Sequence, residues 1–316
     1  MLTILTTTYN CAPYIYLAVK SILNQTCTEF EYIIVDDGSA DNTEFIINSF
    51  NDDRIKYIKT NHIGRGAALN LGIKEAKGDI IALQDADDIS HPRRLEIQLS
   101  GKNQALSNIL LCDVAYFKNN CIHSLAFCSE DFEIFKKKLI LHGPFFHATM
   151  IIKKEHIVNH GGYREDLEAN EDHELFLRLI NKSNFVVTRG SLYFVRLRKN
   201  SLSNKPSLTY QIQKKYFENL RENFDNIPVI EEDKLLGWRE FYYGNKNLAR
   251  QSWIKINFLN WNIKILIAYI LTFLPQDVIE SLISNRKYLR IKYLLNRLTK
   301  FRRLQSEFKN VLNKIV

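Results

Sequence analysis

Three aspartates, Asp85, Asp87 and Asp88, follow an apolar run at residues 79–83 that is typical of a buried strand. Carboxylates this close to one another repel unless a cation or hydrogen bonds compensate them. Their oxygens suit Mg²⁺ or Mn²⁺, and an ion held by one or two carboxylates typically bridges to substrate phosphates. From these residues alone one alternative stays open, a turn in which an aspartate caps the helix expected at 90–99.

A second acidic segment, Asp36-Asp37-Gly38-Ser39, follows another predicted strand at 32–35. Its carboxylates can accept a hydrogen bond from an N–H group of a nucleobase or from a ribose hydroxyl. The alternative is an Asx turn before the next helix.

Two further charged positions stand at predicted helix starts. Arg65 lies between two glycines, where it can pair with a diphosphate at the helix N-terminus. Glu171 and Asp172 begin a helix expected at 172–181. An acid at that place either complements the helix dipole or serves as a general base.

The elements that must position these residues alternate through the first 90 residues. Strands are expected at 2–7, 32–35, 55–59 and 79–83, and helices at 14–23, 43–50 and 66–76. Such β-α-β units predict a parallel sheet covered by helices, and ligands of such sheets bind beyond the carboxyl ends of the strands. The polar segments 6–10, 36–39 and 85–88 all fall at that edge.

The rest of the chain has a different pattern. Residues 100–204 mix short strands with a helix, and 200–207 resemble a linker. After residue 207 only helices are expected, at 208–224, 234–257, 263–274 and from 291 onward. We therefore expect a first domain at 1–204 and a helical, basic C-terminal region at 205–316.

Together these segments resemble the family 2 glycosyltransferases with the GT-A fold, across about residues 1–204. The matching stretches are Thr7-Thr8-Tyr9-Asn10, 21–26, 35–43, 70–73, 78–88, 92–96, Gly161-Gly162-Tyr163 and 171–175. The resemblance implies an α/β fold, a Rossmann-like and mostly parallel sheet between helices, followed here by the helical C-terminal region.

The resemblance also implies a nucleotide-sugar site. Thr7 and Tyr9 would hold the nucleotide base, Asp37 would read uracil with Arg65 nearby, and Asp85 would contact the ribose.

The same resemblance assigns the reacting groups. Asp87 would ligate Mn²⁺ or Mg²⁺ on the sugar diphosphate, and Asp172 would deprotonate the acceptor hydroxyl in a single inverting displacement. Relatives often carry a histidine where this chain has Arg198; arginine cannot ligate a metal but can pair with phosphate, so Arg198 is assigned to the donor. Arg196 could equally be a structural ion-pair partner.

Three residues are candidates for the acceptor side, Glu165, Glu171 and His147. For His147 the alternative is a core histidine with satisfied hydrogen bonds, and for Glu165 it is a solvated surface charge.

Cysteines and termini limit the class of protein. The five cysteines are odd in number and form no Cys-x-x-Cys pair, which disfavours a disulfide framework or zinc site and favours a reducing compartment. The N-terminal residues lack the pattern of a signal peptide. The longest uncharged apolar stretch, 265–274, is about half of a bilayer span.

Charge is unevenly distributed along the chain. The net charge is +8, from 43 basic and 35 acidic residues, but 1–204 hold 23 basic and 25 acidic ones, and after Ser284 ten basic residues face only Glu307. The amphipathic helix there has three interpretations: an interfacial helix on an anionic membrane, packing onto the catalytic domain, or a homodimer seam. Nucleic acid is disfavoured because no binding motif accompanies the charge.

The resulting hypothesis is an inverting, metal-dependent transferase that moves a sugar from a nucleotide sugar, with a UDP sugar favoured, to a glycan or lipid-linked acceptor. We expect it in bacterial surface polysaccharide or oligosaccharide synthesis, cytoplasmic and peripheral on the inner face of the cell membrane. Two alternatives stay open: a non-catalytic membrane-associated scaffold with a decayed transferase domain, and a nucleotidyltransferase. Intact Asp37, Asp85, Asp87 and Asp172 disfavour the scaffold.

Overall fold

A computed structural model describes residues 1–100, 108–126, 135, 146–180, 182–198, 237, 246–256, 263–273 and 298–315. The linker expected at 200–207 and the helix expected at 208–224 lie outside these residues. The described chain forms two compact units, residues 1–198 with 301–316, and residues 199–300.

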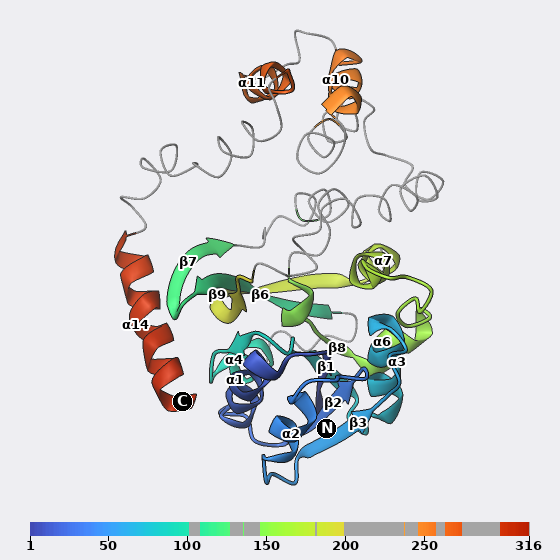
Figure 1. Cartoon of the computed structure of the whole chain (residues 1–316), viewed down its shortest axis with the longest axis vertical. Coiled ribbons are helices and arrows are strands. Elements are labelled where there is room, and N and C mark those ends of the chain that lie inside the picture. Colours follow the sequence, from blue (N-terminus) through green and yellow to red (C-terminus); the bar gives the residue numbers. More distant parts are fainter. Residues whose placement is uncertain are drawn as a thin grey trace. The chain divides into compact units, whose positions relative to one another are not determined.

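The first four strands of the first unit form the expected parallel sheet (Figure 1). They are β1 (Leu2–Thr8), β2 (Phe30–Asp36), β3 (Ile55–Lys59) and β4 (Ile80–Leu83), in the order β3-β2-β1-β4. The connecting helices are α1 (Ala12–Leu23), α2 (Thr43–Asn48) and α3 (Arg65–Glu75). β2 and β4 are mostly apolar, as is typical of parallel strands covered by helices, and Ile4, Ile34 and Ala82 are fully buried. The predicted α/β arrangement is thus confirmed.

The later strands extend the same sheet with mixed direction. β8 (Ile151–Lys153) runs antiparallel to β4, and beyond it lie β6 (Asn108–Lys118), β9 (Asn184–Arg196) and the two-residue β5 (Ile89–Ser90). β7 (Cys121–Ala126) pairs with β6. The order of the whole sheet is β3-β2-β1-β4-β8-β6-β9-β5. β9 runs antiparallel to β5, so its end passes beside the acidic 85–88 loop.

Four short helical elements complete this part of the first unit. They are α4 (Arg94–Gln98), the 3₁₀ helix η2 (His147–Thr149), α6 (Lys154–Asn159) and α7 (Glu171–Leu179). η2 leads into β8, and α7 precedes β9, so both bring residues from beyond position 145 to the parallel strands.

The last helix, α14 (Leu298–Ile315), belongs with the first unit from residue 301 onward, which corrects the expectation of one separate region at 205–316. Its apolar stripe is buried: the ring of Phe308 lies 4.8 Å from that of Phe117 and 4.6 Å from that of Phe194. Figure 1 shows α14 beside β7. Of the three interpretations of this helix, packing is the one found, because the stripe that a membrane or a dimer seam would use is covered by the protein's own sheet.

The second unit is described only in part, and we treat it by itself. α10 (Lys246–Ile254) and α11 (Ile263–Leu271) contact each other, and the Arg250 guanidinium lies 4.4 Å from the centre of the Phe273 ring. Within the described residues of the whole chain, every helix is too short or too polar to span a bilayer.

Candidate active site

The carboxyl ends of β1, β2 and β4 meet at one edge of the sheet. Thr8 lies opposite Asp36, and the amide of Asp37 donates to the carbonyl of Thr8 at 2.8 Å. The half-buried Thr7 precedes this pair, and the 84–88 loop begins on the other side of β1. The structure therefore brings together the polar segments that follow these strands.

Two stacked rings and a buried carboxylate lie at the β1 and β2 end of this edge. The rings of Tyr9 and His62 are 4.3 Å apart, and Tyr9 is half-exposed. The Asp37 carboxylate is buried and accepts hydrogen bonds from the amides of residues 63 and 64, at 2.6 and 3.0 Å, and from the Thr60 hydroxyl at 2.8 Å. Asp37 thus fixes the loop that starts α3. The sequence analysis missed His62, which lies in a loop without a strand or helix pattern.

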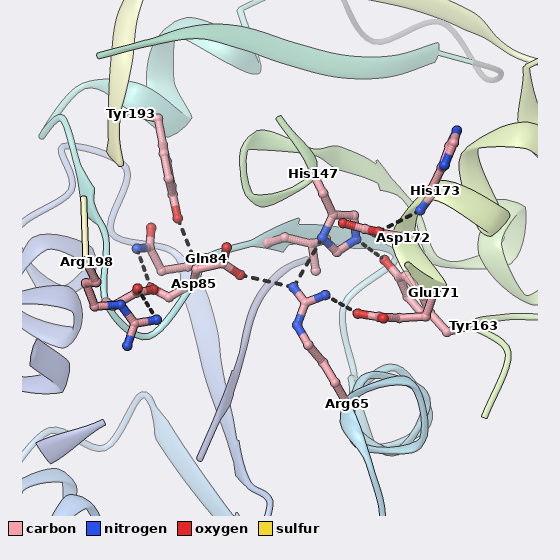
Figure 2. Close-up of polar contacts among 12 residues, drawn as sticks. Arg65, Gln84, Asp85, His147, Tyr163, Glu171, Asp172, His173, Tyr193 and Arg198 are labelled. Carbon is pink, nitrogen blue, oxygen red and sulfur yellow. Dashed lines mark hydrogen bonds and ion pairs between the residues drawn. The ribbon is translucent and has the colours of Figure 1, made fainter. Parts of the chain in front are cut away.

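Arg65, the first residue of α3, joins both halves of the sequence (Figure 2). Its guanidinium forms ion pairs with the carboxylates of Glu171 and of Asp85, the latter at 3.2 Å, and lies 3.5 Å from Nδ1 of His147. Burial disfavours its charge, but the carboxylates of Glu171 and Asp85 outweigh burial and raise the pKa of Arg65.

His147 is a buried residue that supports Arg65. Its Nε2 lies 2.8 Å from the Tyr163 hydroxyl. Burial and the neighbouring Arg65 charge hold the pKa of His147 well below its usual value, so the ring is neutral. Because arginine has only donors, Nδ1 accepts from Arg65 and Nε2–H donates to Tyr163. Both ring nitrogens are engaged, as in the core-histidine alternative.

Asn70 of α3 holds the loop that carries Tyr163. Its Nδ2 donates to the Tyr163 carbonyl, its Oδ1 accepts from the Tyr163 amide, and both distances are 2.8 Å. Gly162 adopts φ +65°, and a Cβ there would lie 2.7 Å from Asn70 Oδ1. The exposed Glu165 also accepts from Asn70 Nδ2, at 2.8 Å. Asn70 therefore positions Tyr163 and, through His147, Arg65.

Asp172 lies in the first turn of α7, after Asn170 in the left-handed conformation. Its Oδ1 accepts from the amide of His173 at 2.7 Å, while the adjacent Glu171 is buried against Arg65. Burial and the Glu171 charge raise the pKa of Asp172 to about 7, against the lowering effects of Arg65 and the His173 amide. A half-buried carboxyl with this pKa is suited to accept a proton near neutral pH.

The other aspartates of the 85–88 loop face β9. Asp87 Oδ2 lies 2.5 Å from Nη2 of Arg198, and the buried Asp88 accepts from the amide of Arg196 at 2.8 Å. Burial, and then the charge of Asp85, raise the pKa of Asp87. Burial and the charge of Asp87 hold the pKa of Asp88 well above its ordinary value.

A buried arginine, Arg94, contacts the residues on both sides of this loop. Arg94 is fully buried and donates to the carbonyl of Leu83 at 2.6 Å and to the hydroxyl of Ser90 at 2.8 Å. Its guanidinium lies 5.1 Å from the centre of the Tyr193 ring, and the Tyr193 hydroxyl accepts from the amide of Asp85 at 2.9 Å. The 92–96 stretch marked Arg94 in the sequence, but only the fold reveals its task.

The residues of this loop fit a hard divalent cation. Asp85 and Asp87 offer carboxylate oxygens, and Mg²⁺ or Mn²⁺ on a nucleotide commonly takes one or two carboxylates with substrate phosphates. Among the described residues there is no group of three or more His, Cys, Asp or Glu side chains that could hold a metal ion. Arg65 and Arg198, which neutralise the two carboxylates, are also suited to phosphate.

Comparisons with known proteins agree with this geometry. A family model described as "Glycosyl transferase family 2" matches residues 3–153. An uncharacterized glycosyltransferase of Methanocaldococcus jannaschii is 30% identical over 258 residues, which cover 77% of this chain and 86% of the relative. The first curated relatives, uncharacterized glycosyltransferases of Rickettsia species, are 26–32% identical, and the chain spans 48–66% of their length.

Solved structures share the fold. TarS of S. aureus, residues 1–349 in complex with UDP-GlcNAc, gives a TM-score of 0.60 at 19% identity and covers 86% of this chain and 79% of its own. A mannosyltransferase of Pyrobaculum calidifontis, in complex with GDP-Man and Mn²⁺, gives a TM-score of 0.57 at 15% identity and covers 99% and 86%. At these identities the similarity shows the fold alone, which confirms the GT-A expectation.

Proposed function

The chain belongs to glycosyl transferase family 2, and from that premise we propose that it is an inverting, metal-dependent enzyme that moves a sugar from a UDP sugar to a glycan or lipid-linked acceptor. The observation that carries the proposal is the place of Asp172: a half-buried carboxyl, its pKa raised to about 7, next in sequence to Glu171, whose ion pair with Arg65 leads to Asp85 in the acidic loop after β4.

The donor nucleotide binds at the ends of β1 and β2 in this proposal. Thr7 and the exposed Tyr9 contact the base. Asp37, whose carboxylate holds the loop that starts α3, reads uracil in this proposal. Asp85 contacts the ribose. TarS, a structural neighbour, binds UDP-GlcNAc, which supports a UDP sugar as the donor.

The diphosphate lies between two arginines in the same proposal. Asp87 holds Mn²⁺ or Mg²⁺, which when bound neutralises charge on the departing diphosphate. Arg65 and Arg198 orient the phosphate oxygens through their guanidinium groups.

Asp172 acts on the acceptor. Its carboxylate removes the proton from the acceptor hydroxyl as that oxygen attacks the anomeric carbon, on the face opposite the leaving diphosphate. One displacement inverts the anomeric centre, so a single base suffices. The buried contacts of Glu171 and His147 support a role in positioning Arg65. Among the acceptor candidates we propose that the exposed Glu165 contacts a sugar.

The setting we propose is synthesis of a bacterial surface polysaccharide, such as a capsule or lipopolysaccharide, on the cytoplasmic face of the membrane. Because the α14 stripe is buried, attachment to anionic lipid rests on basic side chains, including the exposed Arg303, Lys309 and Lys314. Replacing these three by glutamine is expected to weaken sedimentation with anionic vesicles and to leave thermal stability unchanged. Equal sedimentation of both forms refutes this attachment.

A donor panel tests the function. Purified protein with Mn²⁺ is offered UDP, GDP and dTDP sugars, and nucleoside diphosphate release and transfer are measured. We expect release from a UDP sugar and none after EDTA treatment. Absence of both binding and release for every donor would contradict the proposal and favour the non-catalytic scaffold.

A further inference from the structure

The end of β9 is fastened to the acidic loop through its backbone. The Arg196 amide donates to Asp88 Oδ1, and Arg196 Nε donates to the carbonyl of Asp87, both at 2.8 Å. β9 pairs with β5 immediately after this loop, through Ile89 opposite Phe194. Residue 198 is therefore held at a fixed place beside the loop.

Unlike Arg196, Arg198 contacts the carboxylate of Asp87. Its Nη2 lies 2.5 Å from Oδ2 of Asp87, and both side chains are largely shielded from water, with 27% and 16% exposed. The guanidinium groups of Arg196 and Arg198 lie 5.2 and 5.1 Å from the centre of the Tyr14 ring on α1. The aromatic ring and the strand end thus direct a positive charge at the carboxylate oxygen that a cation needs.

We infer that Arg198 is a built-in counter-ion that competes with the divalent cation for Asp87 until the donor diphosphate arrives. This inference rests on the proposed function for the identity of the metal and donor. A guanidinium and a divalent cation on one shielded carboxylate repel each other, so the pair with Arg198 must loosen before a cation binds. A diphosphate offers that guanidinium a new bidentate partner.

The consequence is coupling between metal and nucleotide. The free protein binds metal weakly, because Arg198 occupies Asp87, and the nucleotide strengthens metal binding by drawing Arg198 away. By thermodynamic reciprocity the metal strengthens nucleotide binding by the same factor. A histidine at position 198 would lack this effect, since a neutral imidazole is a ligand and no competitor.

The test measures binding of Mn²⁺ alone, by electron paramagnetic resonance of the free ion, to the full chain without nucleotide. We expect R198Q to bind Mn²⁺ about tenfold more tightly than wild type, and the double variant R198Q/D87N to lose this gain. The matched control R93Q removes the same charge from the exposed pair with Glu96 and is expected to bind like wild type.

Nucleotide dependence gives the second measurement. UDP is expected to increase the Mn²⁺ affinity of wild type by a larger factor than that of R198Q. If R198Q does not fold, judged by its thermal melt, R198K keeps the charge without the planar fork, and we expect it to bind Mn²⁺ more tightly than wild type but less than tenfold.

The inference is overturned if neither variant binds Mn²⁺ more tightly than wild type, or if the gain persists in R198Q/D87N. These outcomes are independent of sugar transfer. A protein that shows the predicted Mn²⁺ behaviour but releases nucleotide from no donor refutes the proposed function and leaves the counter-ion in place.

Discussion

The carboxylates at the sheet edge fall into two groups. In one group a single arginine pairs with several acids, and in the other each acid has its own partner. In the Arg65 cluster (Arg65, Asp85, His147, Glu171 and Asp172), one guanidinium collects acids from both halves of the sequence and leaves Asp172 with a pKa raised to about 7. In the β9 clamp (Asp87, Asp88, Arg196 and Arg198), Asp87 forms an ion pair with Arg198, and Asp88 accepts a hydrogen bond from the amide of Arg196.

The difference teaches how one loop can serve two tasks. In the proposed function the Arg65 cluster serves proton transfer, because burial and the Glu171 charge raise the pKa of Asp172 to about 7. In the proposed function the β9 clamp serves cation and phosphate binding, because a diphosphate can replace Asp87 as the partner of the Arg198 guanidinium. Changes at Asp87 or Arg198 should therefore leave the pH dependence set by Asp172 unchanged.

The largest effect is expected from the β9 clamp. Asp87→Ala removes the carboxylate proposed to hold the metal and should lower sugar transfer by about a thousandfold. The pH at which the residual rate is half-maximal should stay near that of wild type, because burial, Glu171 and Arg65 dominate the pKa of Asp172. The measurement is transfer against pH, with Asp79→Ala, a carboxylate that is 91% exposed, as control. A shifted pH profile would show that Asp87 influences the titration of Asp172, and would contradict the division into two groups.

Breaking the Arg65 cluster should move that profile. Arg65→Met removes a charge that lowers the pKa of Asp172. The base therefore ionises at higher pH, and the acidic limb of the pH–rate profile shifts to higher pH. The buried Glu171 also loses its partner, and unfolding in urea should show a loss of about 2 kcal/mol. Arg65→Lys keeps the charge and should move the limb less. If the acidic limb of the pH–rate profile does not shift in Arg65→Met, the claim that Arg65 influences the pKa of Asp172 is wrong.

Asp172 itself should destabilise the fold as pH rises. Its folded pKa of about 7 exceeds the ordinary value of 3.8, so between these values the folded state holds a proton that the unfolded state has lost. Stability therefore falls with rising pH across this window. Asp172→Asn should be about 1–2 kcal/mol more stable than wild type at pH 8 and equal to it near pH 4, measured by urea unfolding. Equal stability at both pH values would refute the raised pKa.

The smallest effect is expected at the support of the cluster. Tyr163→Phe removes the hydroxyl that accepts from His147, which leaves a buried N–H unpaired at about 1 kcal/mol. Transfer should fall less than tenfold in kcat, with KM unchanged, because Tyr163 acts through Arg65. Tyr16→Phe, on the exposed side of α1, is the control. A change in KM alone would indicate direct contact with substrate.

The parallel half of the fold could be predicted because its signals are local. The apolar runs before Asp36 and Asp85 place both segments at carboxyl ends of neighbouring strands, and parallel sheets gather such ends at one edge. Arg65 was visible for the same reason, as a charge at the start of a helix.

The contacts that join these segments could not be predicted, because they link residues far apart in the sequence. Arg65 and Glu171 are 106 positions apart, and no periodicity relates them. Arg94 and Asn70 lay in recognisable stretches, but their tasks depend on partners brought close by the sheet. The basic helix α14 was open to three interpretations because its pattern fixes an apolar stripe and not the surface that covers it.

Sugar transfer by Asp172→Asn tests the central claim most directly. Wild type and Asp172→Asn, both shown to be folded by their thermal melts and matched in UDP binding, are compared with a UDP sugar, Mn²⁺ and acceptor from about pH 5 to 9. We predict a wild-type rate that rises through about pH 7, and a variant whose transfer is about a thousandfold lower than that of wild type above pH 7 and does not show this rise. A variant that transfers sugar at the wild-type rate would contradict the assignment of Asp172 as the base.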